Sequence, residues 1–74
     1  MKFKIGNYVR IELYMGSINY GIITGLCFNE LGQKCYVTKW IYGDLKGYIC
    51  KDSIKIYDKF YKKVDKDEMM VELL

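Results

Sequence analysis

The chain carries three cysteines and no histidine, so the side chains that most often do chemistry are scarce. Cys27, Cys35 and Cys50 form no Cys-x-x-Cys pair, and a structural zinc site needs about four Cys or His ligands. Without histidine the commonest general base is missing, and no GxxxxGK phosphate loop occurs. These residue types indicate neither a metal site nor a cofactor. We assign no catalytic residue and expect a protein that is not an enzyme.

The cysteines and the first residues also bear on the compartment. The number of cysteines is odd, and residues 1 to 15 carry charges in place of the apolar segment of a secretory signal. No apolar run approaches the ~20 residues that span a bilayer. We therefore expect a cytoplasmic protein whose reduced thiols serve as small buried apolar groups. The alternative is a disulfide between Cys27 and Cys35, which could face each other across a hairpin.

Short runs rich in Ile, Val, Tyr and Thr, separated by Gly and Asn, fill the first two-thirds of the chain. In the first run Val9, Ile11 and Leu13 alternate with polar or aromatic residues, which is the period of a strand with one buried face. Gly21 and Gly25 lie within the second run, where glycine marks a bulge or a bend. We predict a mainly β fold, a five-stranded antiparallel barrel over residues 1 to 58, with strands near residues 7 to 14, 19 to 28, 34 to 42, 46 to 50 and 54 to 57.

The same alternation predicts the side chains that fill the barrel, because every second residue of a half-buried strand points inward. We expect the core to contain Ile5, Val9, Ile11, Leu13, Ile23, Leu26, Val37, Ile49, Ile54 and Ile56.

The segment 59 to 74 reads as a C-terminal extension with a short helix at about 66 to 73. Asp65 resembles an N-cap and Glu68 follows at the third helical position, where acids suit the helix dipole. An apolar stripe follows it, consisting of Met69, Met70, Leu73 and Leu74. Because so short a helix is unstable alone in water, we expect this tail to dock on its own barrel, to form an interface with another chain or to stay disordered.

Three stretches together resemble the SH3-like small barrels of the KOW and Tudor type. Residues 3 to 11 (FKIGNYVRI) are similar to the opening of such domains, residues 20 to 25 (YGIITG) to their second strand, and residues 53 to 57 (SIKIY) to their closing element. The resemblance implies a barrel fold, and small barrels of this kind include nucleic-acid binders, peptide binders and subunits of larger assemblies.

Exposed aromatic and basic side chains are the candidate binding residues. If the alternate apolar residues of the first run face the core, its Tyr and Arg side chains face outward together. On the third run, an inward Val37 would leave an exposed aromatic stripe, whereas the alternative places Trp40 in the core. The candidate aromatic and basic face is Tyr8, Arg10, Tyr14, Tyr36, Trp40 and Tyr42.

Charge and composition suggest the partner. Residues 1 to 64 hold eleven Lys and Arg against five acids, and residues 65 to 74 hold one Lys against four acids. The chain has no Ala, Pro or His and a single Arg against eleven Lys, a bias typical of AT-rich coding. We interpret it as a small phage or mobile-element protein of a low-GC bacterium. We expect protein recognition, as an inhibitor or adaptor of a host factor such as a defence system, or self-association into a homo-oligomer; the alternative is nucleic-acid binding through Tyr and Lys.

Overall fold

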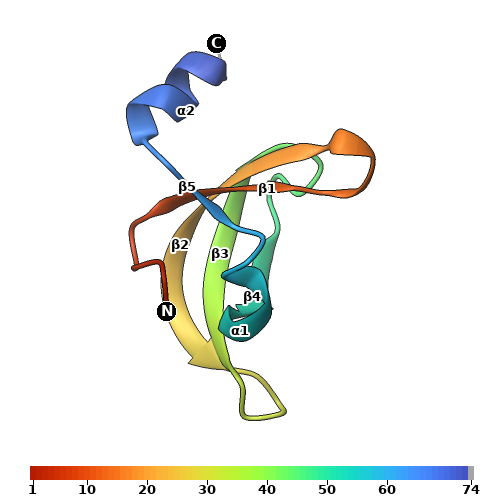
Figure 1. Cartoon of the computed structure of the whole chain (residues 1–74), viewed down its shortest axis with the longest axis vertical. Coiled ribbons are helices and arrows are strands. Elements are labelled where there is room, and N and C mark those ends of the chain that lie inside the picture. The colour runs from red at the N-terminus through yellow and green to blue at the C-terminus, as the bar shows by residue number, and fades with distance from the viewer. Residues whose placement is uncertain (74) are drawn as a thin grey trace.

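The computed structural model describes residues 1–73 and shows a mainly β protein, which confirms the predicted fold class. Its five antiparallel strands form one sheet in the order β4-β3-β2-β1-β5 (Figure 1). The strands are β1 (Tyr8–Glu12), β2 (Ile18–Phe28), β3 (Lys34–Tyr42), β4 (Ile49–Ser53) and β5 (Lys62–Val64). The helical elements are η1 (Tyr14–Gly16), α1 (Ile54–Tyr57) and α2 (Lys66–Glu72).

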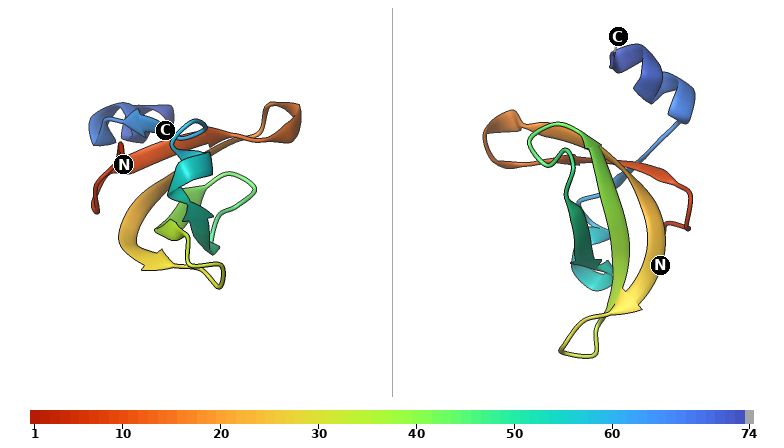
Figure 2. Two further views of the ribbon diagram at one scale, coloured as in Figure 1. Left: turned by 60° about the horizontal axis from the view of Figure 1, so that its bottom comes forward. Right: turned by 180° about the vertical axis from the view of Figure 1, so that it is seen from behind.

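The sheet is strongly bent at β2 (Figure 2). This strand pairs with β1 along its first half and with β3 along most of its length. The β2–β3 register shifts between Tyr20 and Gly21 and again between Ile23 and Gly25, so bulges mark the bend as the two glycines predicted. A Cβ atom on Gly21 would lie 2.7 Å from Cε3 of Trp40. Glycine is therefore needed here to let the indole pack directly on the β2 backbone.

An aromatic cluster fills the concave side of the sheet. The Tyr61 ring lies 5.7 Å from that of Tyr36, 5.8 Å from that of Trp40 and 6.0 Å from that of Phe3. Such ring pairs contribute beyond the area they bury. The buried cluster consists of Phe3, Val9, Ile11, Ile23, Tyr36, Trp40, Ile54 and Tyr61.

The prediction of a fifth strand at residues 54 to 57 is wrong. These residues form α1, and the fifth strand is β5, which pairs with β1. Ile54 and Ile56 suggested the period of a strand, but Ile54, Tyr57 and Tyr61 at i, i+3 and i+7 all face inward, as the period of a helical segment requires. The sheet therefore continues past residue 58, where the barrel was expected to end.

The predicted helix at about 66 to 73 is confirmed as α2, which lies at the end of the molecule opposite the β2–β3 turn (Figure 1). The fourth strand begins three residues later than expected, at Ile49. A loop over residues 43 to 48 displaces it, and Gly43 and Gly47 hold this loop with φ values of 98° and 90°. Only glycine adopts such angles readily.

The predicted core is correct for Val9, Ile11, Ile23 and Ile54, which are buried, while Leu13 and Val37 are half-buried. Four predicted core residues are exposed instead: Ile5, Leu26, Ile49 and Ile56. Ile5 precedes the turn at Gly6 and stands outside the sheet. Ile49 lies opposite the exposed Lys39 on the convex face. Tyr and Trp side chains take their places, and these are so large that a few of them fill the small core.

Candidate protein-binding surface

The expected aromatic stripe on β3 does not exist as a surface, because Tyr36 and Trp40 are 0 % and 1 % exposed. The outward set on this strand is the other one, and it includes the exposed Lys39. The hydroxyl of Tyr36 accepts a hydrogen bond from the N–H of Phe3 over 3.2 Å and donates one to Asp58 over 2.5 Å. Because the Tyr36 side chain points inward, its hydroxyl reaches both hydrogen-bond partners at the edge of the core.

The remaining residues of the predicted face separate into two places. Tyr8 and Arg10 are half-buried on the convex face of β1. Tyr42 is exposed on the same face, because the register shift between Tyr20 and Gly21 pairs it with Tyr20, the partner of Arg10, and not with the inward set of β3. Tyr14 lies elsewhere, because η1 turns the chain after β1 and carries this side chain to the tip of the β1–β2 connection. Tyr8, Arg10 and Tyr42 therefore share one surface, and Tyr14 belongs to another.

The predicted tail interface is only partly available to another chain. Met69 is 2 % exposed within the single chain, so this residue docks α2 in cis. Leu73 is half-buried, whereas Met70 is half-exposed and faces away. Leu74 lies outside the described residues.

The tip of the β1–β2 connection presents two apolar side chains to solvent, with Tyr14 91 % and Met15 92 % exposed. Met15 has φ 64°, a left-handed conformation that costs free energy for a side chain of this kind. The N–H of Leu13 donates to the carbonyl of Ser17 over 2.7 Å and closes the turn. Strain held at an exposed apolar tip is typical of segments that bind a partner.

Side-chain hydrogen bonds fasten this tip to the β3–β4 loop. Ser17 Oγ donates to Asp44 over 2.7 Å, and the N–H of Leu45 donates to Asn19 Oδ1 over 2.9 Å. Asn19 is fully buried, so its position is set by the surrounding backbone. The tip is therefore presented by a rigid support.

A hollow of about 250 Å³ lies between this tip and α1. Glu12 is the one charged residue in its lining, which consists of Ile11, Glu12, Leu13, Tyr14, Ile56, Tyr57 and Phe60. Phe60 is 56 % exposed, and its ring packs edge-on to Tyr57 at 6.1 Å. Tyr57 in turn lies 5.5 Å from the core ring of Tyr61. The surface aromatic is thus anchored to the core through one intermediate ring.

The same packing raises the pKa of the Tyr57 hydroxyl. Burial raises its pKa, and the nearby carboxyl of Asp52 raises it further. The hydroxyl stays neutral at physiological pH, so Tyr57 adds no charge to the lining of the hollow. The hollow is suited to an apolar side chain.

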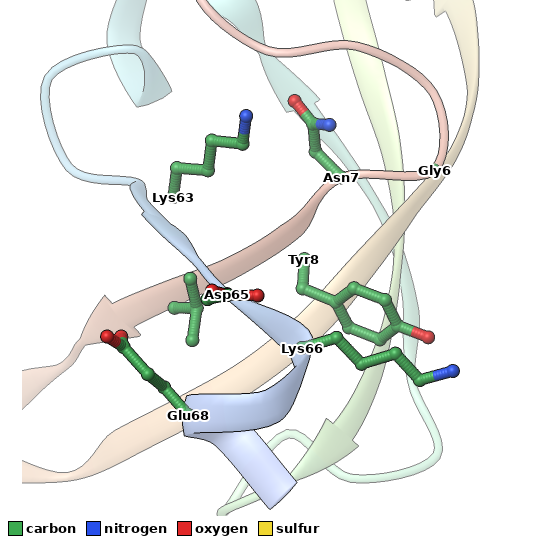
Figure 3. Close-up of a pocket in the computed structure, with 8 residues that line it drawn as sticks. Gly6, Asn7, Tyr8, Lys63, Asp65, Lys66 and Glu68 are labelled. Atoms are coloured by element: carbon green, nitrogen blue, oxygen red, sulfur yellow. The ribbon is translucent and has the colours of Figure 1, made fainter.

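A larger hollow of about 590 Å³ lies where the chain passes from β5 to α2 beside the start of β1 (Figure 3). Lys63 and Lys66 are matched there by Asp65 and Glu68, so its lining has no net charge. Figure 3 shows the stem of Lys66 running alongside the Tyr8 ring. This hollow is the seam between α2 and the sheet, and its mixed lining favours no class of ligand.

The half-buried acids Asp52 and Asp58 each accept a hydrogen bond from a tyrosine hydroxyl. The Tyr61 hydroxyl donates to Asp52 over 2.5 Å and lies 2.9 Å from Oγ1 of Thr38. Burial raises the pKa of Asp52, the Tyr61 hydrogen bond opposes that rise, and burial also raises the pKa of Tyr61. Tyr61 thus connects β3 and β4 to the segment that leads into β5.

The cysteines are free thiols, and Cys27 lies directly opposite Cys35 in the β2–β3 register. Burial raises the pKa of Cys50, which disfavours its thiolate. Among residues 1–73, no group of three Cys, Asp or Glu side chains is placed to hold a metal ion. No helix in that described part of the chain is long and apolar enough to cross a membrane.

Apart from Tyr14, no residue that lines the apolar hollow was predicted to bind anything, and neither was Met15 on the tip beside it. The signal that could have found them is the spacing of apolar residues over 54 to 61, which is helical and leaves Ile56 and Phe60 together on the outer side. This helical spacing was missed because a strand was expected at residues 54 to 57. Comparison of the chain with protein-family models, with curated proteins and with solved structures found no match.

Proposed function

We propose that the protein is a non-catalytic binding module that recognises another protein through the apolar hollow between Tyr14 and Phe60. The observation that carries the proposal is the exposure of Tyr14 and Met15 on a strained tip beside a mostly apolar, aromatic hollow whose lining has one charged residue, Glu12. Folding alone gives no reason to hold these side chains in water. Aromatic side chains around a preformed pocket are typical hot spots of protein interfaces.

The partner is expected to insert an apolar side chain of an exposed segment into the hollow. The SH3-like small barrels that the sequence resembles include such binders. The AT-rich composition supports a mobile-element origin, and with it a host factor as the partner.

Site-specific crosslinking in native cells tests the proposal. A photoreactive phenylalanine analogue replaces Tyr14, and in a matched control it replaces Tyr48, which is exposed on the β3–β4 loop. We expect one discrete protein adduct from position 14 and none of that mass from position 48. Phe60→Glu should abolish this adduct while leaving the circular dichroism spectrum unchanged.

The identity of the adduct then decides the kind of partner. A foreign protein supports recognition of a host factor, and a doubled chain supports self-association through the same hollow. No adduct from position 14, or the same adducts from both positions, would overturn the proposal.

A further inference from the structure

A second surface, distinct from the apolar hollow, lies on the convex face of the sheet. Its residues follow one row across four strands, because each is the register partner of the next: Lys62 of β5, Arg10 of β1, Tyr20 of β2 and Tyr42 of β3. Two cations are thus followed by two phenols. Directly opposite residues of antiparallel strands point to the same face, with Cβ atoms about 5 Å apart.

The two cations of this row repel each other. Like charges directly opposite one another destabilise a sheet, and within residues 1–73 neither Arg10 nor Lys62 forms an ion pair or a side-chain hydrogen bond. Glu12 shares the face two residues along β1 and still does not pair with Arg10. Folding therefore leaves this charge uncompensated, and an anion placed between the two side chains would compensate it.

The phenols at the other end of the row form a fixed aromatic platform. Tyr20 is buried, and its ring lies 6.0 Å from that of Tyr42 with 50° between the ring planes. Tyr42 is 47 % exposed with α2 in place. Strands lie about 4.8 Å apart, so two strand spacings place Tyr42 about 10 Å from Arg10.

We propose that the row Lys62–Arg10–Tyr20–Tyr42 is a docking site for single-stranded nucleic acid, with a backbone phosphate between Lys62 and Arg10 and a base on Tyr42. A flexible strand presents phosphates and unstacked bases together, which a folded acidic protein does not. Stacking on an exposed aromatic combined with cationic contacts to the backbone is the chemistry of such binding. Neighbouring Lys39 lies on the same face in the next row and adds positive potential.

The test is fluorescence anisotropy of the full chain with a labelled oligothymidine of about 16 nucleotides, at the long end of the ~4–16-nucleotide sites of small barrels. We expect the logarithm of the affinity to fall linearly with the logarithm of salt concentration. Lys62→Gln should make that slope shallower by about 0.7, the value for one lost contact to a single strand. Lys55→Gln on α1 removes the same charge from another surface and should leave the slope within error.

Two further variants separate stacking from charge. Tyr42→Leu should weaken binding by roughly 5- to 100-fold, as expected for one lost stacked base, while Tyr48→Leu on the β3–β4 loop should not.

Lys62→Gln should leave the urea midpoint of unfolding unchanged or raise it, because it relieves the repulsion. This stability measurement does not depend on binding.

The proposal is overturned by no binding at about 50 mM salt, where counterion release still favours association. Equal losses for Lys62→Gln and Lys55→Gln would show nonspecific attraction and would also overturn it. The proposal would also fail if two results were found together: a polyglutamate peptide displaces the oligonucleotide, and the Tyr42→Leu variant binds the oligonucleotide normally. A lowered urea midpoint for Lys62→Gln would give Lys62 a structural role and contradict the argument from repulsion.

Discussion

The hydroxyl of Tyr61 lies within hydrogen-bond distance of both Asp52 on β4 and Thr38 on β3, at 2.5 Å and 2.9 Å. Tyr61 directly precedes β5, so this one phenol connects the segment leading into the last strand with two strands on the other side of the core. Thr38 is fully buried and Asp52 is half-buried. Neither has another side-chain partner among residues 1–73.

Tyr61→Phe should therefore destabilise the fold by ~1–3 kcal/mol, because it leaves a buried hydroxyl and a half-buried carboxylate without partners. Urea unfolding followed by circular dichroism measures the change. Tyr48→Phe removes a hydroxyl from an exposed position and should have no effect. Equal stability of Tyr61→Phe and the parent would show that the phenol does not hold the strands together.

Alkaline pH should unfold the protein through its buried phenols. Burial, reinforced by the hydrogen bond to Asp58, raises the pKa of Tyr36 to about 12 in the folded state, compared with about 10 in an unfolded chain. A raised folded pKa stabilises the fold below pH 10, and this stabilisation is lost as the pH rises from about 10 through about 12. The urea midpoint should fall across that range, and less steeply in Tyr36→Phe.

Tyr61 has its pKa raised as well, so part of the alkaline loss should remain in Tyr36→Phe. Tyr14→Phe, at an exposed position, should leave the pH dependence unchanged and serves as the control. An identical pH profile for Tyr36→Phe and the parent would contradict the assignment.

Two glycines of the β3–β4 loop offer a matched pair of substitutions. Gly43 and Gly47 both have positive φ, but a Cβ atom at Gly43 would overlap Oδ1 of Asn19 and the carbonyl of Ile18, whereas at Gly47 it would meet nothing. Gly47→Ala should cost about 1 kcal/mol from backbone strain. Gly43→Ala should cost a further ~1–3 kcal/mol, because it displaces the buried Asn19 from its hydrogen bond with Leu45. Thermal or urea unfolding of the two variants measures this difference, and equal losses would contradict it.

The thiols of Cys27 and Cys35 should form a disulfide when the protein is treated with diamide. They are register partners on β2 and β3, and directly opposite residues of antiparallel strands have Cα separations of about 4.5–5.5 Å, within the range a disulfide spans. Mass spectrometry should show the loss of both thiol hydrogens in the parent and in Cys50→Ser. Cys35→Ser should prevent it, and an intramolecular bridge to Cys50 in the parent would refute the pairing.

Elements could be predicted from the sequence where local pattern and tertiary structure agree. β3 lies at the residues predicted for it, 34 to 42, because its β-branched and aromatic residues favour a strand whichever face is buried. That same property concealed its orientation. Val37 and Ile41 on one face are as apolar as Tyr36 and Trp40 on the other, and only Lys39 indicated the outward side.

The last strand could not be predicted from local pattern, since Lys62-Lys63-Val64 has no apolar alternation. Its place in the sheet follows from pairing with β1, a relationship between residues about fifty positions apart that no local window contains. The hollow at Phe60 was hidden for a related reason. It is formed by the helical course of residues 54 to 61 brought against a distant turn.

The pairing of β1 with β5 has a consequence for how the protein folds during synthesis. Because translation proceeds from the N-terminus, β1 must wait with one edge unpaired until β5 has left the ribosome. An uncovered strand edge is a template for association with another chain. The nascent polypeptide is therefore most prone to aggregate before Lys62–Val64 emerges, and a factor that shelters the outer edge of β1 during that interval should raise the yield of folded protein.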